Sequence, residues 1–129
     1  VLGDDDLAFL QAELLSTDQT VRSFGGLRPE RIVEGPTYQF ELAQNYPNPF
    51  NPSTTISFSV ARSTDVTLAI FDVRGSLVST LVRDRREAGV HRIGWDGTDS
   101  RGTRVASGVY FYRLNAGSFR ATRKMVLLR

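Results

Sequence analysis

The sequence predicts an all-β protein: an immunoglobulin-like β-sandwich of about seven strands, preceded by an acidic N-terminal segment and a linker. From position 38 onward, alternating apolar and polar stretches recur at about the 8–12-residue spacing typical of a sandwich. Three closely spaced prolines (Pro47, Pro49 and Pro52) precede the first clear alternation. The charge changes sign at the same place, because residues 1–41 carry eight acidic and three basic side chains within a chain of net charge +2.

Residues 1–37 are expected to be the end of an upstream region followed by a linker. Asp4–Asp6 can cap a short helix from about Leu7 to Leu15, and the alternative is a strand left from a preceding domain. Residues 16–36 mix glycines and prolines with charged residues, which is typical of a linker. The chain begins at Val1 without the layout of a signal peptide, so we expect a piece of a longer precursor.

The predicted domain, residues 38–129, begins with an alternation of Tyr38, Phe40 and Leu42 that indicates a first strand. The proline-containing stretch that follows cannot lie inside a helix or a central strand, because proline lacks an N–H group and fixes φ. We therefore expect a stiff, extended segment at the entrance of the sandwich. Its aromatic residues, Tyr46 and Phe50, are predicted to plug the open end.

Six further strands follow from the same alternation. They are Thr55–Val60, Val66–Asp72, Leu77–Val82, Val90–Trp95, Val109–Leu114 and Phe119–Leu128. Turns are expected at 61–65, 73–76, 96–102 and 115–118, and a charged connection at 83–89. Trp95 shares a predicted face with His91 and Ile93 and is the natural anchor of the core.

Catalysis is not expected. His91 is the only histidine, and Ser107, which precedes Gly108, lacks the glycine of a nucleophile elbow because position 105 is valine. Cysteine is absent, so the chain has no disulfide, and one imidazole without thiolates cannot close a zinc site. The sequence thus predicts a protein that is not an enzyme and uses no cofactor.

The loop 96–102, which contains Asp96 and Asp99, carries oxygen ligands at alternate positions, which is a weak calcium signal. A calcium loop needs glycine and glutamate at its sixth and twelfth positions, where this chain has Arg101 and Ser107. The favoured interpretation is that both aspartates accept backbone N–H groups in tight turns. A single calcium ion that also uses backbone carbonyls is the alternative.

Neither nucleic-acid binding nor a membrane-spanning segment is expected. Basic residues between 83 and 104 alternate with acidic ones, and the aromatic residues are predicted to point inward. No run of about 18 apolar residues is present. The basic residues considered are Arg83, Arg85, Arg86, Arg92, Arg101 and Arg104, and the interleaved acids are Asp84, Glu87, Asp96 and Asp99.

Several stretches between Leu42 and Arg129 stand out in order: Leu42–Ile56, Leu68–Gly75, Trp95–Gly97 with Gly102, Ala106–Leu114 and Lys124–Arg129. Together they resemble the C-terminal sorting domains (type A) of proteins exported by the bacterial type IX secretion system. A related immunoglobulin-like module occurs in flagellar hook-capping proteins. Because the resemblance reaches the last residue, and a sorting signal must end its precursor, we expect the chain to end where the precursor ends.

The resemblance implies a non-catalytic sorting and anchoring domain. An outer-membrane translocon would recognise the folded domain and export an upstream passenger from the periplasm to the cell surface or beyond. In this family a surface peptidase typically removes the domain, and the passenger is attached to surface lipopolysaccharide. The residues implied in recognition are Pro47, Asn48, Pro49, Phe50, Asn51, Pro52, Gly108, Val109, Tyr110, Lys124 and Arg129.

Two other functions remain open. One is a structural module that assembles with copies of itself, as in hook-capping proteins. The other is an accessory carbohydrate-binding sandwich of a secreted enzyme. The latter needs a solvent-facing aromatic platform, which only Phe71 and Phe111 can offer in the predicted alternation.

Overall fold

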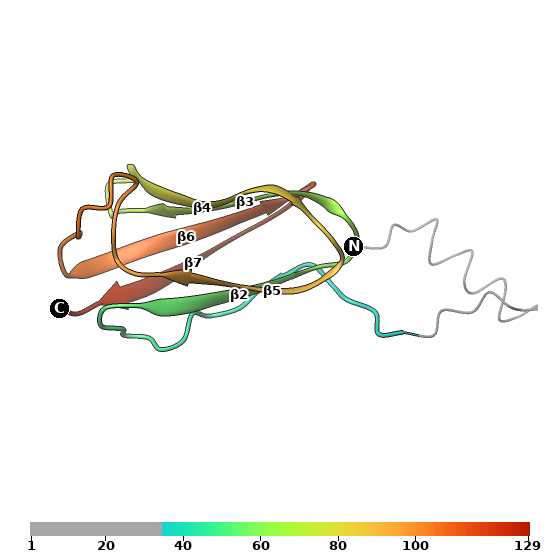
Figure 1. Ribbon diagram of the computed structural model, residues 1–129, viewed down its shortest axis with the longest axis horizontal. Helices are drawn as coiled ribbons and strands as arrows, with labels where there is room; N and C mark the ends of the chain where they lie inside the picture. The colour runs from blue at the N-terminus through green and yellow to red at the C-terminus, as the bar shows by residue number, and fades with distance from the viewer. Residues whose placement is uncertain (1–34) are drawn as a thin grey trace, which may run out of the picture. The chain divides into compact units, whose positions relative to one another are not determined.

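A computed structural model describes residues 35–129, and within them Tyr38–Arg129 form one compact unit. The helix or strand expected near Leu7–Leu15 and most of the expected linker lie outside the described residues. The described part contains seven strands in two antiparallel sheets, which confirms the all-β, immunoglobulin-like sandwich (Figure 1).

The two sheets have the orders β1-β2-β5 and β4-β3-β6-β7. In the three-stranded sheet, β2 and β5 pair over seven consecutive positions, from Thr54 opposite Trp95 to Val60 opposite Gly89. In the four-stranded sheet, the pairing of β3 with β4 shifts register twice, after Leu68 and after Ile70. The strands are β1 (Glu41–Leu42), β2 (Thr54–Val60), β3 (Thr64–Phe71), β4 (Leu77–Arg86), β5 (Gly89–Trp95), β6 (Gly108–Ala116) and β7 (Phe119–Leu127).

The core lies between the sheets and is filled by alternate residues of the strands, as period-2 side-chain geometry requires. Trp95 is only 2% exposed, which confirms its predicted place in the core. The inward residues of β2, β3 and β6 are buried as their alternation predicts. They are Ile56, Phe58 and Val60, then Val66, Leu68 and Ile70, and finally Tyr110, Tyr112 and Leu114.

The predicted charged connection at 83–89 is wrong. β4 continues to Arg86 and β5 begins at Gly89, so only Glu87 and Ala88 separate the two strands. The charged stretch is a strand because β3 supplies partners for it, with Asp65 opposite Arg85 and 3.5 Å between Asp65 Oδ1 and Arg85 Nη1. Likewise, β3 begins at Thr64, inside the turn expected at 61–65.

Tyr46 does not plug the sandwich as expected, whereas Phe50 does. Phe50 is 2% exposed and Tyr46 is 81% exposed. The reason is register: Tyr46 and Thr55 exchange two backbone hydrogen bonds of 3.0 Å, and residues directly opposite share a face of the sheet. Since Thr55 faces solvent, Tyr46 does too.

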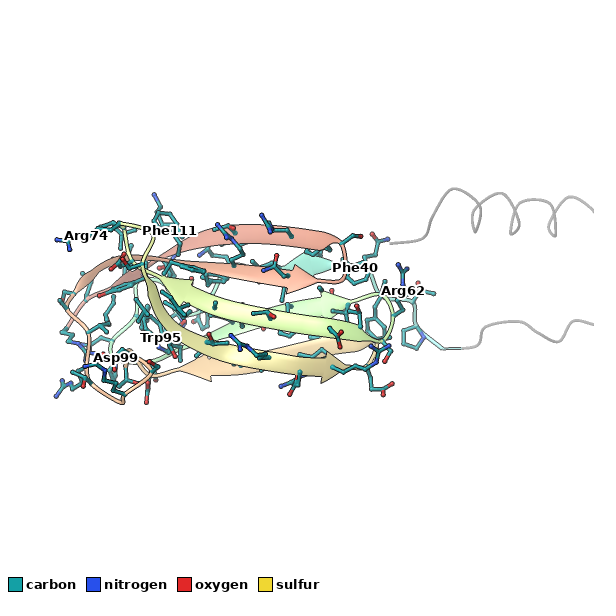
Figure 2. The ribbon with its side chains drawn as sticks, turned by 90° about the horizontal axis from the view of Figure 1, so that it is seen from above. Phe40, Arg62, Arg74, Trp95, Asp99 and Phe111 are labelled. Carbon is teal, nitrogen blue, oxygen red and sulfur yellow. The ribbon has the colours of Figure 1, made fainter. Side chains whose placement is uncertain are left out.

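The ends of the unit differ from the expected strands as well. β1 spans only Glu41–Leu42, although Phe40 packs nearby with its ring stacked on Phe119 at 5.7 Å. Figure 2 shows Phe40 and Arg62 at one end of the sandwich and Trp95 and Asp99 towards the other. At the C-terminus, β7 ends at Leu127, and Leu128 is 52% exposed.

Candidate functional site: the proline segment and the terminal strand

The proline segment, defined here as Asn45–Pro52, is hydrogen-bonded to the end of β7. The N–H of Phe50 donates to Val126 O, and the N–H of Leu128 donates to Phe50 O, both at 3.0 Å. These two bonds form a parallel bridge between Phe50 and Leu127. Figure 1 shows the segment after β1 and the C-terminus at the same end of the sandwich.

Side chains extend this contact along β7. Asn48 Oδ1 accepts the N–H of Val126 at 3.0 Å, and Gln44 Nε2 donates to Lys124 O at 2.8 Å. An edge strand otherwise presents unpaired N–H and C=O groups to any chain that can pair with them. The residues from Gln44 to Phe50 therefore cover the edge of the last part of β7.

Asn45 fixes the proline segment to both sheets, a role that the sequence did not predict. This residue is 2% exposed. Its backbone N–H donates to Tyr112 Oη at 2.8 Å, and its Nδ2 donates to Thr54 Oγ1 at 3.0 Å. Tyr112 lies in β6 and Thr54 in β2, so one asparagine bridges the layers. A buried polar side chain needs such partners, but which asparagine of the segment would be buried depends on packing.

Tyr112 completes this network. Its hydroxyl donates to Ala43 O at 2.7 Å while accepting the N–H of Asn45. Burial is the main cause that raises the pKa of this phenol above its usual 10.0. The hydroxyl therefore stays protonated through neutral pH and links the backbone of Ala43 to that of Asn45.

The start of β6 joins the same cluster. Gly108, Val109 and Tyr110 lie opposite Leu127, Val126 and Met125 in the ladder. The structure thus brings the three stretches implied in recognition together. Beneath them, the Trp95 ring centroid lies 5.7 Å from that of Phe50 and 5.6 Å from that of Tyr110.

The two implied cations, Lys124 and Arg129, have different environments. Arg129 is tied to the loop after β5: Nε donates to Val105 O and Nη2 donates to Gly97 O, each at 2.7 Å. Its backbone N–H donates to Ser107 Oγ at 2.8 Å. The Lys124 side chain is exposed, and no hydrogen bond or ion pair holds it within residues 35–129. Of these two cations, Lys124 is therefore the one whose ammonium group is available to bind another molecule.

Asp96 and Asp99 form the hydrogen bonds that the turn interpretation expects. Asp99 Oδ1 accepts the N–H groups of Arg101 and Thr103 at 2.9 Å, and these bonds to Thr103 and then Arg101 are the main causes that lower its pKa below 3.8. Asp96 Oδ1 accepts the N–H of Thr98 at 3.2 Å. Among the described residues, no three acidic, histidine or cysteine side chains cluster to hold a metal ion.

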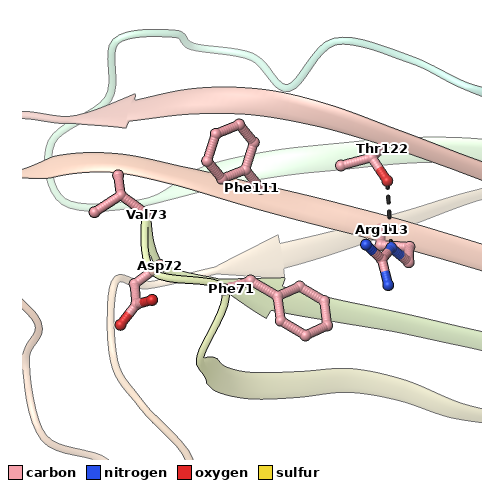
Figure 3. Close-up of a pocket in the computed structure, with 7 residues that line it drawn as sticks. Phe71, Asp72, Val73, Phe111, Arg113 and Thr122 are labelled. Carbon is pink, nitrogen blue, oxygen red and sulfur yellow. Dashed lines mark hydrogen bonds between the residues drawn. The ribbon is translucent and has the colours of Figure 1, made fainter.

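Phe71 and Phe111, the residues considered for a carbohydrate platform, lie opposite each other on β3 and β6. With neighbours that include Asp72 and Thr122, they line a depression of about 300 Å³ (Figure 3). The guanidinium carbon of Arg113 lies 5.2 Å from the centre of the Phe71 ring and so covers one of its faces. Phe111 is therefore the aromatic surface that stays open.

These features define an immunoglobulin-like module with a hydrogen-bonded surface at one end. The chain belongs to the family of FlgD Ig-like domains, whose model matches residues 44–118. The match begins just before the proline segment and ends in the β6–β7 turn. No curated protein sequence matches the chain. Within residues 35–129, no helix has the length and apolar character needed to cross a bilayer.

Three of the solved structures that align with the chain come from two bacteria. Dimeric latent PorU from Porphyromonas gingivalis aligns with a TM-score of 0.57 and 23% identity, over 76% of this chain and 10% of PorU. PorZ, an essential surface component of the type IX secretion system of the same organism, gives 0.47 and 22%, over 67% of this chain and 11% of PorZ. FlgD from P. aeruginosa aligns with a TM-score of 0.46 and 22% identity, over 57% of this chain and 58% of FlgD. The chain thus spans about a tenth of PorU, and the likeness to PorU concerns the fold alone.

Proposed function

We propose that residues 38–129 are a non-catalytic sorting and anchoring domain. In this proposal it directs an upstream passenger from the periplasm through a type IX secretion translocon to the cell surface or beyond. Its partners are the outer-membrane translocon and the surface peptidase. The observation that carries the proposal is that the proline segment, the start of β6 and the end of β7, which carry the resemblance, form one hydrogen-bonded surface.

The chemistry of this surface suits recognition by another protein. Tyr46 is 81% exposed and Leu128 is 52% exposed, so two large apolar side chains face solvent on segments that the core holds in place. Pro47 and Pro49 are exposed beside Tyr46, and proline loses little conformational freedom on binding. Lys124 adds one unpaired positive charge. Aromatic anchors on a preorganised backbone are typical of binding hot spots.

A reporter fused before the full chain tests the proposal. Tyr46→Ser with Lys124→Gln changes two exposed side chains, so we expect normal unfolding and a reporter that accumulates in the periplasm. The matched control is Leu77→Thr with Arg83→Gln, which alters exposed side chains elsewhere and should leave export intact. Export of the Tyr46 and Lys124 variant at the wild-type level would contradict recognition at this surface.

Arg129 needs a separate test, because it donates three hydrogen bonds to the loop after β5. Arg129→Gln removes the two guanidinium bonds, so a loss of export can arise from a loosened loop. We expect the melting temperature of this variant to fall, whereas Lys124→Gln alone leaves it unchanged. An export defect in Lys124→Gln at an unchanged melting temperature therefore assigns recognition to Lys124.

A structural assembly module is the second candidate, and the match to FlgD Ig-like domains favours it. It predicts that the purified chain self-associates and that deletion of residues 42–129 leaves passenger export intact. Sedimentation of the chain and export of the truncated fusion distinguish the two functions. A carbohydrate-binding role gains no support, because Arg113 covers one face of Phe71.

Our proposal includes the absence of catalysis. His91 stacks on Phe58 with ring centroids 5.3 Å apart, and its Nε2 lies 2.8 Å from Glu87 O. Both contacts are structural. Hydrolytic turnover by the purified chain that disappears in His91→Ala would overturn this part of the proposal.

A further inference from the structure

Strands β1, β4, β5 and β7 form the edges of the two sheets, and three of these edges are protected. β1 has only two residues, and the proline segment covers the end of β7. β4 pairs with β3 through two register shifts and carries the charged run Arg83–Arg86. Short length, covering segments, bulges and charges are the devices by which natural proteins block unwanted strand pairing.

β5 lacks the short length, the covering segment and the bulges that protect the other edges, and it carries only one charged side chain, Arg92. It keeps unbroken register with β2 over seven positions and contains no proline and no lysine. Its outward face consists of Val90, Arg92 and Gly94, all exposed, so it bears a single charge. No described carboxylate forms an ion pair with Arg92. The neighbouring outward side chains of β2 are small: Thr55, Ser57 and Ser59.

The direction of the hydrogen bonds shows which backbone groups lie at this edge. Thr55 bonds to Tyr46 through both its N–H and C=O groups, and Ser57 O accepts from Ala43, so these residues turn their backbone away from β5. In an antiparallel ladder the alternate residues of β2 then bond to β5, through His91 and Ile93. The N–H and C=O groups of Val90, Arg92 and Gly94 consequently point outward, and no backbone bond to another part of residues 35–129 uses them.

We propose that the outer edge of β5, from Val90 to Gly94, binds an extended, acidic segment of another protein by β-strand addition. In this mode of recognition, main-chain hydrogen bonds to the edge groups of Val90, Arg92 and Gly94 supply the affinity. Side chains at alternate positions of the added strand supply the specificity. A carboxylate opposite Arg92 forms a favourable cross-strand pair.

A second copy of this chain fits the edge less well. In a two-fold antiparallel pairing, the register that engages all three outward residues places Arg92 of one copy directly opposite Arg92 of the other. Like charges in that position destabilise a strand pair. Registers shifted along the strand separate the arginines but engage only two of the three residues. The edge therefore favours a different chain with the opposite charge.

Amide hydrogen exchange of the full chain tests this inference. The probe is a capped seven-residue peptide of alternating valine and threonine with glutamate at its centre. The peptide should slow exchange at Val90, Arg92 and Gly94, whereas His91 and Ile93, which bond to β2, should be protected with or without it. A matched peptide with lysine at its centre should bind several-fold more weakly, and Arg92→Glu should reverse this preference.

Gly94→Pro supplies a second variant. It removes one outward donor, and proline is tolerated at edge positions whose N–H faces solvent. We expect weaker peptide binding with the β2–β5 amides still protected, while Arg92→Lys keeps both charge and binding. Equal binding of both peptides, protection of β4 or β7 instead of β5, or protection that grows with the concentration of the chain alone would each overturn the inference. These measurements are independent of passenger export and of the proline segment.

Discussion

Trp95 connects the core to the surface loops at the scale of a single residue. It packs between Phe50 and Tyr110, and its Nε1 donates to Thr98 O at 2.8 Å. We expect Trp95→Ala to lower the free energy of unfolding by about 3–5 kcal/mol, the usual cost of truncating a large buried aromatic side chain. Urea denaturation monitored by circular dichroism gives the value.

The control for this prediction is Tyr46→Ala, which also truncates a large aromatic side chain to a methyl group, but one that is 81% exposed. Its free energy of unfolding should stay within about 0.5 kcal/mol of wild type, as for most surface substitutions. Equal losses in the two variants would contradict the assignment of Trp95 to the core and Tyr46 to the surface.

Tyr112 gives a prediction that depends on pH. Tyr112→Phe leaves the buried N–H of Asn45 without its acceptor, so we expect a loss of about 1–3 kcal/mol at pH 7. Because burial raises the pKa of Tyr112 in the folded state above 10.0, its stabilisation is complete below pH 10.0 and is lost as the pH rises through the folded pKa.

The measurement is urea denaturation across the alkaline range. Stability should fall less steeply above pH 10.0 in Tyr112→Phe than in wild type. Burial also raises the pKa of Tyr110, so this residue should account for the pH dependence of stability that remains in the variant. An unchanged alkaline slope in the variant would show that the Tyr112 hydroxyl is not buried as described.

At the scale of an element, β7 shows how sharply alternation decides the energetic role of a residue. Leu127 is fully buried, while Leu128 is 52% exposed. Leu127→Ala should cost about 2–5 kcal/mol, and Leu128→Ala no more than about 0.5 kcal/mol. Thermal unfolding of the two variants checks this difference, and a larger loss for Leu128 would mean that the register of β7 is shifted by one residue.

Alternation was also the signal that predicted most of the fold. It identified the inward faces of β2, β3 and β6 because each has one face in the core. It failed for Arg83–Arg86, where both faces of β4 carry polar side chains and strand formation depends on pairing with β3. The sequence of a charged stretch does not indicate whether a neighbouring strand will pair with it, so the extension of β4 to Arg86 could not be predicted.

The candidate site was predictable in its parts but not in its arrangement. The proline segment, the start of β6 and the terminal strand each stood out in the sequence. Their contacts did not, because the bond between Phe50 and Val126 joins residues far apart in the chain. The exposure of Tyr46 was unpredictable for the same reason, because it depends on pairing with Thr55. So was the role of Arg129, whose guanidinium donates hydrogen bonds to backbone carbonyls of a distant loop.

At the scale of the whole chain, limited proteolysis should distinguish the sandwich from the preceding residues. We expect trypsin to cleave first at Arg28 or Arg31, which lie in a polar stretch containing glycine and proline. A resistant fragment should retain Tyr38–Arg129, because arginines within strands are poor substrates and the turns at Arg74 and Arg101 are held by hydrogen bonds to Asp72 and Asp99. Mass spectrometry identifies the fragment, and early cleavage at Arg85 would contradict the extent of β4.

The parallel bridge between Phe50 and Leu127 has a mechanical consequence. Phe40 stacks on Phe119 at the beginning of β7, and the chain then runs alongside β7 in the same direction until Phe50 reaches its end. A force that pulls Tyr38 and Arg129 apart therefore slides these two segments past each other. The bonds of Phe50 to Val126 and Leu128 lie across that direction and must rupture together rather than in sequence. Resistance to pulling is governed by the rate of this rupture, so the domain can withstand tension between its ends even where its equilibrium stability is ordinary.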